Sequence, residues 1–291
     1  MRTSNWGRWG DEDERGALNL LTPERIVEAA QLVREGRVYQ LGLSIQPSGV
    51  PYFKHRPPAL HFMARDGGDY AAGVIRPDNV GTADDWLGLA THGTTHIDAL
   101  CHLWYDGTMY NGFSSNEVTS NGAGRNGIEK IGPIVARGVM LDVAALHGVD
   151  HLAPDHGIGA EELEACEARQ RVRVGAGDVL LVRTGWLKVF ELDEDLYHRQ
   201  QPGITTDAVP WLVERDVAAV GADNGAVERL PDPSGHVRVH QLLLRDYGVH
   251  LMELLVLDEL GADRVSEFLF VAAPLRIKRA AGSPLNPVAI V

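Results

Sequence analysis

The sequence has few cysteines and no long apolar run. Only Cys101 and Cys166 occur among the 291 residues, which excludes a framework of disulfide bonds. No apolar stretch reaches the roughly 18 residues that a membrane-spanning helix needs. Residues 1–6 lack the apolar core of a secretory signal. We therefore expect a cytoplasmic protein that does not span a membrane.

Positive charge is also scarce. Lys and Arg number 27 against 40 for Asp and Glu, so the net charge is −13. A surface of this sign repels phosphate backbones, and we expect no nucleic-acid partner. Histidine, by contrast, is plentiful, with 12 residues, and several of them share short segments with carboxylates.

Apolar segments of strand length alternate with segments of helical spacing, which predicts an α/β fold. We find no internal repeat or long linker, so 1–291 is expected to be a single domain with 1–20 as an N-terminal arm. Residues 47–88 are rich in Pro, Gly and Asp and predict long loops with short strands. The expected strands are 38–45, 134–143, 178–184, 218–222, 250–257 and 268–277, and the expected helices are 23–36, 160–169, 206–215 and 240–246.

The densest group of chemically active side chains lies at 92–102, where the sequence reads H-x-x-x-H-x-D-x-x-x-H. On a helix, His92 and His96 would share a face; on a strand, His96 and Asp98 would share one. Either geometry offers imidazoles and a carboxylate to one point. That set of ligands suits Zn²⁺, Mn²⁺ or Fe²⁺ rather than Ca²⁺ or Mg²⁺, which prefer oxygen ligands alone.

This segment resembles the signature H-x-G-T-H-x-D-x-P-x-H of the cyclase superfamily, which includes bacterial kynurenine formamidase and isatin hydrolase. The histidines and the aspartate keep their spacing, while Gly93 sits one place early and Leu100 replaces the usual proline. The resemblance implies a single cyclase domain of the swivelling β/β/α type, with a mixed sheet and flanking helices. Further segments similar to the longer members of the superfamily are 6–10, 16–19, 177–186, 221–223 and 281–284.

A second pair resembles the formamidase branch, in which a His is followed about a dozen residues later by a Glu. Here the pair is His240 and Glu253. Glu253 sits in an apolar strand, where a bare carboxylate is costly unless it is paired or metal-bound. The alternatives are a half-exposed strand for Glu253 and a surface or capping role for His240.

The resemblance also implies how the residues divide their roles. His92, His96 and Asp98 would hold a first metal ion, and Asp98 and Glu253 would bridge to a second ion that His240 helps to bind. The ions would be Zn or Mn, and either one or two of them. His102 would remain free as the general acid and base, because a histidine titrates near neutral pH.

Aromatic residues near the cluster are candidates for a substrate pocket, although plain core packing explains each of them as well. Asp223 follows a buried strand and would either contact substrate or support a turn. Cys101 is a nucleophile candidate, but a small buried apolar role is favoured. The histidines at 147–156 predict a solvated loop. The aromatic candidates are Trp6, Trp9, Tyr52, Phe53, Phe62 and Trp104.

The function that the resemblance implies is metal-dependent hydrolysis of a C–N amide bond in a small aromatic or cyclic amide, such as an aryl formamide or isatin. A metal-dependent cyclase, dehydratase or lactonase is the alternative, and a binding protein without turnover is a further one. A non-haem iron oxygenase would use His96, Asp98 and His240, but it requires an antiparallel β-barrel. The resemblance also implies a homodimer or homotetramer.

Overall fold

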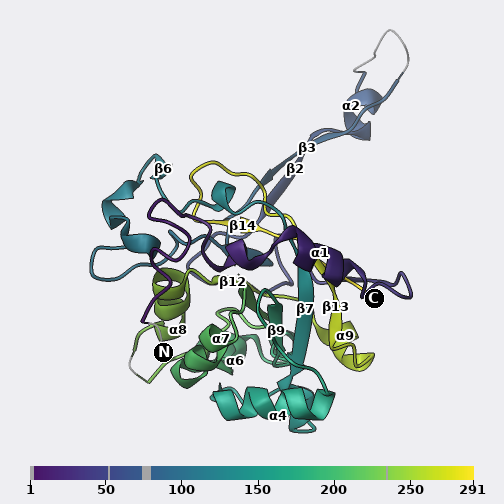
Figure 1. Cartoon of the computed structure of the whole chain (residues 1–291). Helices are drawn as coiled ribbons and strands as arrows, with labels where there is room; N and C mark the ends of the chain where they lie inside the picture. The colour runs from purple at the N-terminus through teal and green to yellow at the C-terminus, as the bar shows by residue number, and fades with distance from the viewer. Residues whose placement is uncertain (1–2, 52, 74–79, 234) are drawn as a thin grey trace.

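The computed structural model describes residues 3–51, 53–73, 80–233 and 235–291. Within them, a nine-stranded sheet runs through the molecule in the order β1-β15-β13-β7-β9-β11-β12-β4-β14 (Figure 1). Its strands are β1 Val38–Gln40, β4 His96–Asp98, β7 Ile134–Asp142, β9 Val179–Arg183, β11 Ala219–Ala222, β12 His250–Glu253, β13 Glu267–Ala272, β14 Gly282–Pro284 and β15 Val288–Ile290.

The sheet is mixed. Strands β7, β9, β11 and β12 are parallel to one another, and the strands that flank them pair antiparallel. Because strands from both ends of the chain enter one sheet, the predicted single α/β domain with a mixed sheet is confirmed. This sheet is not the antiparallel barrel that the oxygenase alternative requires.

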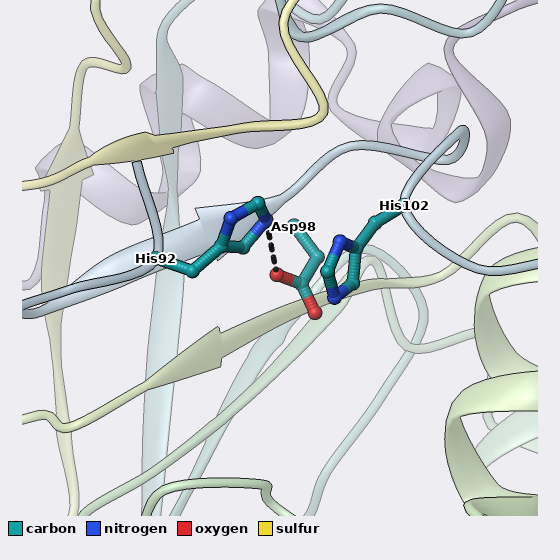
Figure 2. Close-up of side chains that lie close together, drawn as sticks. All are labelled: His92, Asp98 and His102. Carbon is teal, nitrogen blue, oxygen red and sulfur yellow. Dashed lines mark ion pairs between the residues drawn. The ribbon is translucent and has the colours of Figure 1, made fainter. Parts of the chain in front are cut away.

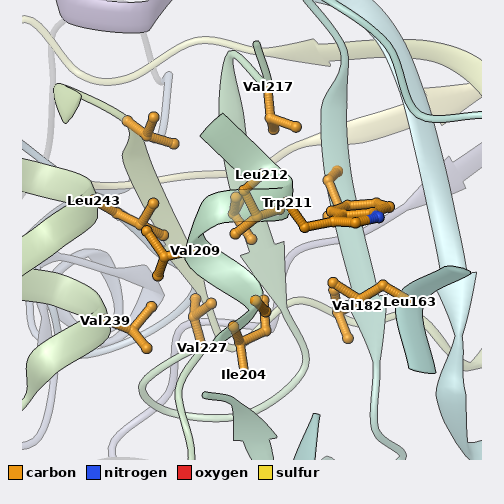
Figure 3. Packing of buried hydrophobic residues seen from close by; sticks show 14 of the residues in the cluster. Leu163, Val182, Ile204, Val209, Trp211, Leu212, Val217, Val227, Val239 and Leu243 are labelled. Carbon is orange, nitrogen blue, oxygen red and sulfur yellow. The ribbon is translucent and has the colours of Figure 1, made fainter. Parts of the chain in front are cut away.

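Both faces of the central strands are buried. Leu180 and Val182 of β9 belong to one apolar core, while Val179 and Leu181 belong to another on the opposite face. The first core also contains residues of α4 Ala160–Gln170 and α7 Val209–Glu214 (Figure 3). Burial on both faces explains why this strand is a continuous apolar run rather than an alternating one.

The predicted elements exist, but several end early. Helix α1 Pro23–Ala30 begins as predicted, with the Thr22 hydroxyl accepting from the Arg25 N–H, and it ends before Gly36. Strand β12 ends at Glu253 because Leu254 has a φ of 58°, which no strand continues. Strands β1 and β13 also end short of the predicted 45 and 277.

The predicted helix 240–246 is divided in two. Residues Arg238–His240 form α8, and Gln241–Tyr247 form the π-helical segment η6. Gly248 then adopts a left-handed conformation and its carbonyl accepts from the N–H of Ala17 in the N-terminal arm. π-Helical segments of this kind are frequent at functional sites.

A hairpin projects from the body of the molecule, as Figure 1 shows for β2 Leu60–Arg65, β3 Asp84–Gly88 and the helix α2 Gly67–Ala71. No helix in the described part of the chain is long and apolar enough to cross a membrane. The remaining elements are η1 Gly16–Leu20, η2 Tyr110–Gly112, η3 Ser115–Glu117, β5 Val118–Thr119, β6 Gly122–Ala123, η4 Ile128–Lys130, α3 Val143–Leu146, β8 Gly157–Ile158, α5 Leu187–Leu192, α6 Glu194–Arg199, β10 Gly203–Ile204, η5 Thr206–Ala208 and α9 Asp258–Ala262.

Candidate metal centre

The pairing of β4 with β12 brings the two halves of the predicted site together. The strands are antiparallel, with His96 directly opposite Glu253. Residues opposite each other on such strands share a face, and so do residues two apart on one strand. Asp98 therefore joins His96 and Glu253 on one face, and the strand interpretation of residues 96–98 is the correct one.

His92 and His102 come from the turns before and after β4, and the Asp98 carboxylate lies close to both rings (Figure 2). The Nε2 atom of His92 is 3.3 Å from Asp98 Oδ1. The two imidazoles are stacked, with ring centroids 4.1 Å apart. Gly282 of β14 pairs with Asp98, and a Cβ there would lie 2.4 Å from His92 Nε2, so only glycine leaves room for this ring.

Asp98 also belongs to a second group, with His240 and Glu253. The Nε2 atom of His240 is 3.0 Å from Glu253 Oε1 and 3.7 Å from Asp98 Oδ2. The other Glu253 oxygen is 3.1 Å from His96 Nε2. In each group the ligand atoms lie within 4.8 Å of one another, so Asp98 offers one carboxylate to two adjoining clusters of donors.

Contacts of the Nδ1 atoms fix the orientation of the imidazole rings. The Nδ1 atom of His96 lies 2.7 Å from the Thr94 carbonyl, to which only an N–H can donate. His92 Nδ1 lies 3.0 Å from the Thr91 hydroxyl, and His240 Nδ1 contacts a carboxylate oxygen of Glu228. In all three rings Nε2 is left facing the carboxylates, the arrangement typical of metal-binding histidines.

Several buried atoms at the centre have no hydrogen-bond partner. They are Nε2 of His92, Nε2 of His96 and both oxygens of Asp98. A buried polar atom without a partner costs about 1–3 kcal/mol. A divalent transition metal accepts imidazole nitrogen and carboxylate oxygen together, so these residues fit such an ion.

Burial and neighbouring groups set the protonation states of the donors. Burial lowers the pKa of His92 to about 3, so its ring is neutral. Burial acts to raise the pKa of Glu253, but the adjacent imidazoles of His240 and His96 outweigh it and the pKa falls below its usual value. A neutral imidazole and an ionised carboxylate are the forms that bind metals. Burial acts to lower the pKa of His96 and His240, but the neighbouring carboxylates raise both above the usual value, so a bound metal would have to displace a proton from these two rings.

Two residues near the centre were missed by the sequence analysis. Glu228 is buried and accepts hydrogen bonds from the backbone N–H groups of Val239 and His240 as well as contacting the His240 ring. Arg56 donates to the His92 carbonyl at 2.6 Å. The sequence offered little signal for Glu228, an acid followed by Arg229 and twelve residues before His240. Arg56 lies among loop residues and gave no signal.

The tryptophan candidates lie at different places. Trp6 donates its indole N–H to the carbonyl of Arg245 and packs beneath that guanidinium at 4.6 Å. Trp9 lies against Arg8 in the same way and borders the core. Trp104 follows His102 by two residues and is 41% exposed. Contact with substrate stays a prediction for all three.

The remaining candidates have other surroundings. Phe62 stacks on Trp86 in the projecting hairpin. Both oxygens of Asp223 accept hydrogen bonds from Thr184 and Gly185, which gives Asp223 the turn-supporting role. Burial raises the pKa of the Cys101 thiol to about 12, so it is not an activated nucleophile. Tyr52 lies outside the described residues.

Comparisons with known proteins agree with this geometry. A model of the family described as putative cyclase matches residues 39–229. The chain belongs to the cyclase family. The isatin hydrolase of Roseibium aggregatum is 29% identical over 218 residues, covering 71% of this cyclase-family chain and 74% of that protein. A crystal structure of a novel cyclase matches at 38% identity and a TM-score of 0.93 over 100% of both chains.

Isatin hydrolase structures share the fold more distantly. One that is bound to the product analogue thioisatinate has 20% identity and a TM-score of 0.63, covering 93% of this chain and 99% of that one. At this identity the likeness concerns the fold alone. The mixed sheet with its flanking helices is therefore the fold of the cyclase family, as the sequence predicted.

The contact between Glu228 and His240 yields a prediction. Glu228→Gln removes the charge that orients this ring, and we expect metal affinity to fall about 10- to 100-fold. Isothermal titration of the metal-free protein with Zn²⁺ or Mn²⁺ measures this directly. Glu214→Gln, at an exposed position, serves as the control. Equal affinities for the two variants would show that Glu228 does not support the metal centre.

Proposed function

We propose that this chain is a metal-dependent hydrolase that cleaves a C–N amide bond in a small aromatic or cyclic amide, such as an aryl formamide or isatin. The observation that carries the proposal is the pair of donor groups that share Asp98 and leave its oxygens without hydrogen bonds. The similarity to an isatin hydrolase supports the choice of bond.

The donor atoms gather around Asp98 in two groups, one with His92 and His102 and the other with His240 and Glu253, and His96 lies beside both carboxylates. His92, His96 and Asp98 would hold one Zn or Mn ion, and Asp98, His240 and Glu253 a second. A divalent ion lowers the pKa of a bound water from 15.7 to about 7 and polarises a carbonyl oxygen. The protein contributes ligands in fixed positions. Two of them, His96 and Asp98, are almost inaccessible to solvent, so one side of the site is dry.

We infer that His102 moves protons in this reaction. Its ring is buried less completely than the other histidines of the centre and lies beside the Asp98 carboxylate. Burial lowers its pKa, so the ring is neutral near pH 7 and accepts a proton from the attacking water. The same nitrogen then donates that proton to the leaving nitrogen of the amide, which needs it to depart.

A panel of substrates tests the reaction. We expect the metal-loaded protein to release acid from an N-formyl aniline or from isatin, because both present an amide carbonyl beside an aromatic ring. Chelation should abolish the release, and Zn²⁺ or Mn²⁺ should restore it. Lactones and cyclic imides complete the panel. Failure to release acid from any member, with metal bound, would favour the cyclase or dehydratase alternative.

The role of His102 can be separated from metal binding. His102 lies within ligand distance of His92 and Asp98, so its ring could serve either purpose. We expect His102→Ala to keep its metal and to lose about 10²- to 10⁴-fold in kcat, the usual contribution of a general acid or base. Metal content by mass spectrometry and turnover are measured together. Loss of metal from this variant, but not from the exposed control His236→Ala, would make His102 a ligand.

We further propose that the chain forms a homodimer through the projecting hairpin. Phe62 and Trp86 stack there and are 55% and 53% exposed, and Met63 and Leu87 beside them are also exposed. A two-stranded hairpin alone is marginally stable in water. A second copy of the chain would cover these side chains and support the hairpin.

Sedimentation of the hairpin variants tests this assembly. The unmodified chain is expected to sediment as a dimer or tetramer, and the double variant Phe62→Ser, Trp86→Ser as a smaller species, because the apolar contact is lost. Leu192→Ser is the control, since Leu192 is 74% exposed but lies on the body of the molecule. A monomeric unmodified chain, or equal masses for all three proteins, would contradict the proposal.

A further inference from the structure

A second group of potential ligands lies apart from the site described above. His147 follows α3, His156 ends the loop that comes next, and Glu162 lies near the beginning of α4. Their ligand atoms lie within 4.8 Å of one another. In Figure 1, α4 lies at the lower edge of the molecule, away from β12 and β14, so this group is separate from the centre around Asp98.

The donors converge on one carboxylate. The Nε2 atom of His156 is 2.9 Å and 3.1 Å from the two oxygens of Glu162, and Nε2 of His147 contacts the first of these oxygens. The two imidazoles stand edge to face, with ring centroids 5.0 Å apart. Two nitrogens and a carboxylate thus point at one small volume, although the sequence had predicted only a solvated loop here.

Backbone hydrogen bonds and helix packing fix the segments that carry these side chains. The N–H of His147 donates to Val143 of α3, and the carbonyl of His156 accepts from Gly203 at 3.1 Å. Glu162 is fixed on helix α4, whose residues pack on those of α3. A site whose ligands are already positioned loses less conformational entropy when it binds an ion.

From this geometry we propose a second metal site, made by His147, His156 and Glu162, for Zn²⁺ or a similar transition metal. Two imidazoles and one carboxylate are a ligand set that Zn²⁺ accepts, with a water as the fourth ligand. His147 is 43% exposed, so solvent reaches the fourth position. The ion would tie both ends of the 147–156 loop to α4 and so stabilise this end of the fold.

Zinc stoichiometry after equilibrium dialysis tests the site. Glu162→Gln removes the carboxylate shared by both histidines, and we expect it to bind one zinc fewer per chain than the unmodified protein. Glu161→Gln is the matched control, because it removes the same charge from the same first turn of α4. His156→Ala removes a different ligand, and we expect it also to bind one zinc fewer per chain. Equal zinc content in all four proteins would overturn the proposal.

Stability gives an independent measurement. Zinc should raise the melting temperature of the unmodified chain more than that of Glu162→Gln, because binding to the native state alone stabilises it. Turnover and the metal-free melting temperature of each variant check that it folds, since none of these residues belongs to the centre around Asp98. An equal rise for Glu162→Gln and Glu161→Gln would show that the ions bind only at the first centre, and would overturn the second site.

Discussion

Both carboxylate oxygens of Asp98 are buried without a hydrogen bond, while the imidazoles of His92, His96 and His240 direct Nε2 at the same space. Such an arrangement is unfavourable for the protein alone, because unpaired buried polar atoms cost free energy. One or two divalent cations would satisfy the atoms that lack a partner. The strands and turns around Asp98 hold its carboxylate and these rings in position.

The sheet provides most of that support. Strand β4 is only three residues long, yet it lies between β12 and β14. Its register with each of these strands brings one residue that the metal centre needs next to it. Glu253 comes opposite His96 on one side. Gly282 comes opposite Asp98 on the other and leaves space for the His92 ring. A shift of one residue in either pairing would turn these side chains to the other face.

A second layer of contacts fixes His240. It stands where α8 passes into the π-helical segment η6, and its ring is held by Glu228 on one nitrogen and Glu253 on the other. The N-terminal arm holds the turn that follows η6, because the N–H of Ala17 donates to the carbonyl of Gly248. The N-terminal arm thus helps to support the metal centre.

The sequence by itself determined the α/β class, the apolar central strands and the ligand spacing at 92–102, because these depend on local periodicity and on residue type. Only the tertiary structure decided that residues 96–98 form a strand, that Asp223 supports a turn, and that Glu228 stands behind His240. The first depends on the pairing of β4 with β12 and β14, and the other two depend on side-chain hydrogen bonds between separate segments. Pairing joins residues more than a hundred positions apart, as it does His96 and Glu253, and no local pattern specifies it.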